Sequence, residues 1–97
     1  MNEKYKFKAA DFYEQLEEQK YRCPLTTFEL TPENVTAEHK VPLQEGGLHE
    51  RENIYLVDRT VAKIKRYTTE KRLLEIAVAV VKTIGKKHGY SIRKSKK

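Results

Sequence analysis

The chain has 97 residues, enough for one small domain, with 38% hydrophobic and 35% charged side chains. Its apolar residues are grouped, which argues against a disordered chain. The formal net charge of +6 favours a polyanionic partner, and the longest apolar run, residues 76–81, is too short to cross a membrane. The single cysteine, Cys23, excludes an internal disulfide and a four-cysteine zinc site, so we expect no structural zinc.

Charge is distributed unevenly along the chain. Residues 23–58 carry two basic and seven acidic side chains, whereas residues 59–97 carry thirteen basic and two acidic ones. An acidic segment beside a basic one suits a phosphate-binding protein with a cation site, and a solvated lysine-rich surface is the alternative. The charged first eight residues show no apolar signal region, and the lone cysteine suits a reducing cytoplasm, so we expect a cytoplasmic protein.

The first third of the chain predicts one helix followed by turns. Over residues 9–20, Phe12, Tyr13 and Leu16 recur at helical spacing and are assigned to the core. Residues 21–30 contain a proline and a threonine pair, which predict a tight turn or short hairpin with Cys23 as a small buried residue.

The middle of the chain predicts a strand and a glycine loop. Val35 and Ala37 alternate with Thr36 and Glu38, as in a strand with one buried face. The loop at residues 44–47 ends in two glycines, which permit positive φ and close approach of the backbone to a ligand.

The last half predicts helices and a basic tail. Residues 50–66 carry apolar side chains at helical spacing, although the part around residues 53–57 also fits an extended chain. Residues 70–84 show the widest apolar stripe, for which we expect a packing role, with a cap at Thr68-Thr69 and a stop at Gly85. The tail, residues 86–97, holds six basic side chains and no acidic one.

The Glu38-His39 pair is the strongest chemical signal. Hydrolysis of a phosphodiester needs a group that takes a proton from water and positive charge that stabilises the phosphoryl and leaving oxygens. A histidine with a pKa near 6.5 suits the first task, and Mg²⁺ held by one or two oxygen ligands suits the second. A bend after the strand, near Pro42, would let Glu38 and His39 reach one site.

The surrounding motifs strengthen this interpretation. In order, residues 23–65 contain Cys-Pro-Leu-Thr, Leu-Thr-Pro-Glu-Asn, Glu-His-Lys-Val-Pro-Leu, Gly-Gly, Asn-Ile-Tyr-Leu-Val and Lys-Ile-Lys. This run resembles the HNH endonuclease family. The resemblance implies a small α+β fold, a ββα-metal domain over residues 1–97 flanked here by an N-terminal helix and a long C-terminal helix. It also implies His39 as general base, Glu38 as ligand of Mg²⁺ or Mn²⁺, and Asn53, fourteen positions after His39, as the residue that orients the ring.

One family position departs from the pattern. Nine positions after Asn53 the family carries a His or Asn that completes the metal site, and this chain has Ala62. Alanine has no donor atom, so the resemblance implies a cleavage activity that is lost or weakened. His49, in the loop, is a less favoured substitute ligand.

Three classes of function remain open from the sequence: a metal-dependent DNA endonuclease impaired at residue 62, a degenerate HNH-type DNA-binding module, and an accessory protein recruited through its basic tail. We favour the first. One HNH site cuts one strand, so a double-strand break would need a homodimer or a larger nuclease assembly. The side chains expected to contact DNA are Lys40, Arg59, Lys63, Lys65 and Arg66.

Overall fold

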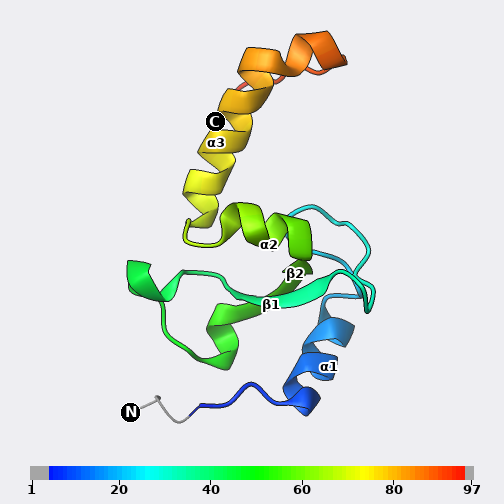
Figure 1. Cartoon of the computed structure of the whole chain (residues 1–97), viewed down its shortest axis with the longest axis vertical. Coiled ribbons are helices and arrows are strands. Elements are labelled where there is room, and N and C mark those ends of the chain that lie inside the picture. Colours follow the sequence, from blue (N-terminus) through cyan, green and yellow to red (C-terminus); the bar gives the residue numbers. More distant parts are fainter. Residues whose placement is uncertain (1–4, 96–97) are drawn as a thin grey trace.

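The computed structural model describes residues 5–95, which form a small α+β fold as predicted (Figure 1). In the described residues, the helices and strands are α1 (Ala9–Glu18), β1 (Val35–His39), β2 (Ile54–Asp58), α2 (Arg59–Lys65) and α3 (Glu70–Ile84), with short 3₁₀ turns η1 (Leu43–Glu45), η2 (Arg51–Asn53) and η3 (Gly85–His88). The expected ββα order is therefore present, with a helix before it and a long helix after it.

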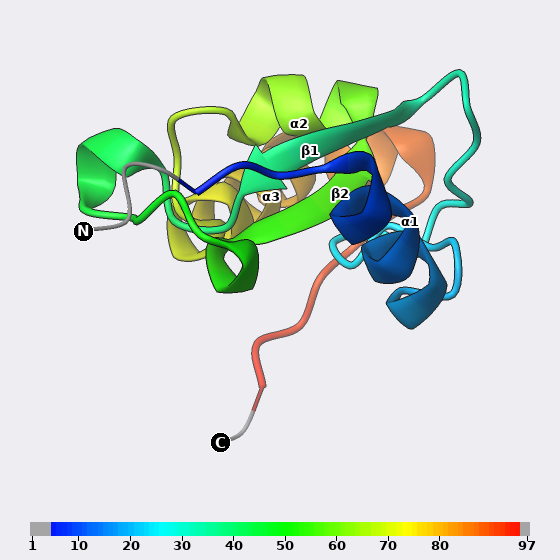
Figure 2. The same cartoon turned by 90° about the horizontal axis from the view of Figure 1, so that it is seen from below.

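The two strands pair antiparallel and lie between α1 and α2 (Figures 1 and 2). Strand β2 is buried over its first four residues because α1 packs against it and α2 packs against both strands. The edge of β2 that does not pair with β1 is covered at Leu56 by the side-chain amide of Gln19. This amide donates to the carbonyl oxygen of Leu56 at 2.8 Å and accepts from its N–H at 2.9 Å. The expected alternation in β1 is wrong at Ala37, which is exposed although it faces buried Leu56 across the strand pair, because α1 packs mainly against β2.

The N-terminal segment completes the core. Helix α1 ends at Glu18, two residues earlier than predicted, and the following Lys20 and Tyr21 adopt φ of 55° and 60°. The predicted short hairpin is present as a bridge between Arg22 and Glu29, and Cys23 is buried as expected. The core cluster joins this segment to β2 and α2 through Leu16, Cys23, Leu30, Tyr55, Leu56, Val57 and Ala62.

Residues 50–66 divide into a strand and a helix, since the extended alternative holds for residues 54–58. Asp58 starts α2 as its cap, accepting hydrogen bonds from the backbone N–H groups of Thr60 and Val61. The side chain of Asn34 donates to the other oxygen of Asp58 at 2.9 Å, which ties the start of β1 to the start of α2.

Helix α3 has the predicted bounds but not the predicted packing. Thr69 caps its start and Gly85 follows its end, as the sequence indicates. Nevertheless α3 has no buried residue, because it extends away from the strand pair and contacts mainly α2 and η3 (Figure 1). Within residues 5–95 no helix is long and apolar enough to cross a membrane.

Candidate active-site cleft

Glu38 and His39 lie at the end of β1 and line one cleft of about 430 Å³. The other walls come from the loop after β1 and from the turn between α2 and α3, and they consist of Pro42, Leu43, Gln44, Arg66 and Tyr67. Of the residues predicted for the site, Glu38, His39 and Arg66 thus line a common cavity. Tyr67 is a wall residue that the sequence interpretation missed, although an exposed aromatic beside basic residues is a known signal for nucleic-acid binding.

Asn53 holds the loop that forms one wall of the cleft. Its Oδ1 accepts a hydrogen bond from the N–H of Val41 at 3.0 Å, and its Nδ2 donates to the carbonyl oxygens of Val41 and Leu48 at 3.0 and 2.8 Å. The backbone oxygen of Asn53 accepts from the N–H of Lys40 at 2.7 Å. Because the amide is used by the backbone, Asn53 acts on the geometry of the loop around His39 rather than as a free ligand.

The same loop needs a glycine at position 47. A Cβ atom placed there would lie 1.9 Å from the backbone oxygen of Val41 and 2.9 Å from Nδ2 of Asn53. Gly46, one residue earlier, has open space around it but a φ of 94°. The close approach expected at the glycine pair is therefore made to the chain's own backbone.

His39 is accompanied by His49, which comes from the same loop. Nε2 of His39 lies 3.0 Å from Nδ1 of His49, and the two rings meet edge to face with centroids 5.2 Å apart. Burial lowers the pKa of His39 below its ordinary value, and the nearby His49 and Lys65 lower it further. His39 is therefore poised as a neutral imidazole at neutral pH.

The structure corrects the expectation for Lys65, which is fully buried and cannot contact DNA as an exposed cation. Its Nζ donates a hydrogen bond to the carbonyl oxygen of His39 at 3.0 Å and lies 5.9 Å from the centre of the Tyr55 ring. It reaches this position because α2 packs against both strands. Lys65 thus ties the end of β1 to α2.

Glu38 is a carboxylate in a partly buried setting. Burial raises its pKa, and Lys65 and Arg66 oppose that rise. One of its oxygens, Oε2, is buried and has no hydrogen-bond partner within the described part of the chain. A buried carboxylate oxygen without a partner is a feature that a bound cation or a donor on a ligand would satisfy.

Ala62 lies in the core cluster, with 2% of its surface exposed, and does not line the cleft. The α2 residue that reaches β1 is instead Lys65, one turn further on. Among residues 5–95 no three His, Cys, Asp or Glu side chains come together as a metal-binding group. Any cation at Glu38 would therefore depend on oxygens of water and of a bound phosphate.

The remaining predicted DNA contacts are spread along α2 and the loop after β1. Arg59, Lys63 and Arg66 are exposed along and just after α2, and Lys40 is half-buried with its Nζ 5.8 Å from the Tyr55 ring centre. Residues 96–97 of the basic tail lie outside the described residues.

Comparison with known proteins adds no assignment: no family model matches the sequence, and no curated protein matches it. The resemblance to HNH endonucleases thus rests on the quoted motifs.

Proposed function

We propose that the chain is an HNH-type DNA endonuclease whose activity is weakened at residue 62. The observation that carries this proposal is the placement of Glu38 and His39 in one cleft with Arg66 on its wall. The clamp formed by Asn53 around the adjoining loop supports it, because hydrolysis requires a base held in a fixed position.

In this proposal His39 takes the proton from the attacking water. Its Nε2 is engaged by His49, which leaves Nδ1 to take the proton, and the lowered pKa keeps the ring neutral at neutral pH. Lys65 and Asn53 fix the backbone on either side of the ring. Arg66 binds the phosphoryl oxygens from the cleft wall.

A divalent cation, Mg²⁺ or Mn²⁺, fits this site only as an ion shared with the substrate. Glu38 would hold it through the oxygen that lacks a partner, since Mg²⁺ keeps several waters and needs few protein ligands. When bound, it would supply charge stabilisation to the phosphoryl and leaving oxygens. With Ala62 in the core and no donor beside it, we expect slow cleavage.

A plasmid-nicking assay with Mg²⁺ or Mn²⁺ tests the proposal. We expect weak nicking by the chain itself, loss of that nicking in His39→Ala and in Glu38→Ala, and no gain from Ala62→Asn or Ala62→His, because residue 62 lies in the core and does not line the cleft. Ala37→Ser is the matched control for His39→Ala, because Ala37 is an exposed residue of β1, the strand that carries His39, and lies outside the cleft. Because position 62 is buried, thermal unfolding of each variant accompanies the assay. A folded, unchanged chain that cuts no DNA under these conditions would contradict the proposal.

The second candidate is a DNA-binding module that does not cut. Burial of Ala62 away from the cleft and the lack of a three-residue metal group within residues 5–95 favour it. The same exposed cations would then act through phosphate contacts alone. Fluorescence anisotropy with labelled duplex measures binding, and the plasmid assay measures nicking. A folded chain that binds duplex but never nicks it, with or without a donor at residue 62, fits this candidate alone.

A further inference from the structure

Helix α3 carries an apolar face that the rest of the described chain leaves uncovered. Leu74 is 65% exposed, Val80 48% and Ile84 41%, although α3 is 15 residues long and its start is capped by the side chain of Thr69. Isolated helices of this length are marginal in water, and an amphipathic helix gains its stability by packing its apolar face. An apolar face of this extent on a projecting helix marks an interaction surface.

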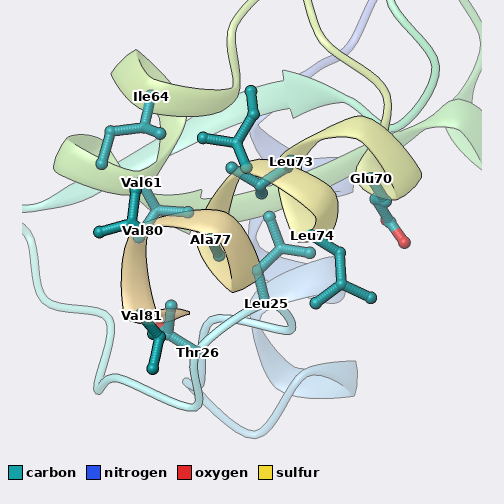
Figure 3. Close-up of a pocket in the computed structure, with 11 residues that line it drawn as sticks. Leu25, Thr26, Val61, Ile64, Glu70, Leu73, Leu74, Ala77, Val80 and Val81 are labelled. Atoms are coloured by element: carbon teal, nitrogen blue, oxygen red, sulfur yellow. The ribbon is translucent and has the colours of Figure 1, made fainter. Parts of the chain in front are cut away.

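The face continues into a groove between α3 and the body of the protein. Figure 3 shows this groove, about 490 Å³ in volume, with Val61 and Ile64 of α2 on one wall and Ala77 and Val80 of α3 on the other. Leu25, from the turn after α1, lines its end. The groove and the face together present a mostly apolar surface, in which the polar lining residues of the groove are Thr26 and Glu70. Glu70 accepts a hydrogen bond from Tyr55 at 3.0 Å.

We propose that this surface binds the α3 helix of a second copy of the chain, antiparallel and around a twofold axis. Leu73, Ala77, Val80 and Ile84 follow one another at intervals of four, three and four residues, the spacing of a helix that packs along another helix. In an antiparallel pair centred between residues 78 and 79, Leu73 of one copy faces Ile84 of the other and Ala77 faces Val80. Two large residues thus meet at each end of the contact, Ala77 meets the larger Val80 near its centre, and each copy supplies the same surface.

The helix dipoles favour the same arrangement. At 100° per residue, the charged side chains of α3 other than Glu70 lie outside the apolar face, and Arg72 and Glu75 flank it in a surface hollow shared with Val80 and Ile84. The start of α3 carries Glu70, Lys71 and Arg72, and Lys86 and Lys87 follow its end. In an antiparallel pair the helix dipoles oppose, whereas a parallel pair would place like ends of the dipoles, and the Lys86-Lys87 ends, side by side.

The inference does not depend on the chemistry of the cleft, although a dimer would bring two clefts into one particle. Its test is the solution mass of the intact chain by sedimentation equilibrium over micromolar to millimolar concentrations. We expect the average mass to rise with concentration from 11.4 kDa, the mass of one chain, toward twice that value. A chain that stays monomeric up to millimolar concentration overturns the proposal, whether or not it then binds lipid vesicles or another protein.

A matched pair of variants locates the interface. Ala77→Glu places a charge on the apolar face, and Ala79→Glu makes the same change on the opposite side of the same helix. We expect the first to weaken dimerisation by about a hundredfold or more, because it buries an unpaired charge, and the second to leave it within a few-fold. Equal effects of both variants would overturn the assignment. Amide exchange of the unchanged chain gives a variant-free readout: α3 must become more protected as the dimer forms.

Discussion

Helices α2 and α3 show opposite relations between hydropathy and burial. The seven-residue α2 buries a lysine completely, while the fifteen-residue α3, the more apolar helix, buries nothing within the described chain. Lys65 is buried because its ammonium finds the carbonyl oxygen of His39 and the face of Tyr55. Leu74, Ile76, Val80 and Ile84 of α3 are exposed because no other element of the described chain covers them. Burial is thus decided by available partners, and side-chain polarity alone does not determine it.

The largest expected effect comes from a pair of Leu→Ala substitutions, one in β2 and one in α3. Leu56→Ala removes a side chain with no exposed surface and should lower the free energy of unfolding by about 2–5 kcal/mol. Leu74→Ala removes one that is 65% exposed and should cost below about 0.5 kcal/mol at concentrations where the chain is monomeric. Denaturant unfolding measures both, and a large loss for Leu74→Ala in the monomer would show that α3 packs in the core after all.

A second pair tests the loop that walls the cleft. Gly47→Ala forces a Cβ against the oxygen of Val41 and should destabilise by about 2–4 kcal/mol, with loss of the His39–His49 contact. Gly46→Ala meets only backbone strain at positive φ and should cost ~1 kcal/mol. Chemical denaturation with imidazole NMR signals as a local probe reports both; equal costs would mean that the close approach at residue 47 is unimportant.

Two lysines of α2 sharpen the contrast between exposed and buried cations. Lys63→Ala should reduce the slope of log binding constant against log salt by about one unit, because one phosphate contact is lost. Lys65→Met should leave that slope unchanged, since its ammonium is engaged by His39 within the fold. Anisotropy titrations with duplex DNA over a range of salt measure the slopes. A reduced slope for a folded Lys65→Met protein would contradict the structural role.

The smallest expected effect concerns the pKa of His39. Its folded-state pKa lies below 6.5, so between the two values the unfolded chain binds more protons, and stability falls as pH decreases through this window. His49→Ala should raise the pKa of His39 toward 6.5, whereas His88→Ala, in η3, should leave it unchanged. NMR titration of the imidazole resonances checks this, and a pKa of 6.5 or higher in the unchanged chain would contradict it.

Local signals in the sequence were sufficient for much of the fold. Periodicity located α1 and α3, Thr69 and Gly85 marked the ends of α3, and the alternation before His39 located β1. These features depend on neighbours in sequence. The division of residues 50–66 into a strand and a helix was only one of two possibilities, because a short apolar run has no period that separates them.

The features that sequence reasoning missed depend on distant partners. The charge of Lys65 predicts a contact with DNA, but the side chain is buried because its ammonium donates to the carbonyl oxygen of His39, 26 positions away in the sequence. The pairing of His39 with His49 requires the loop clamped by Asn53. That α3 lacks a cover follows from the direction in which it leaves α2, which no periodicity encodes.

We propose that phosphodiesters bind in the cleft between β1, its following loop and the α2–α3 turn. The most direct test is NMR titration of the isotope-labelled chain with a short DNA duplex at moderate salt, followed through backbone amides and histidine rings. We expect the largest shifts at His39, Arg66 and Tyr67, with weaker shifts along the exposed face of α2. Shifts confined to the basic tail and α3, with the resonances of His39 unmoved, would contradict the claim.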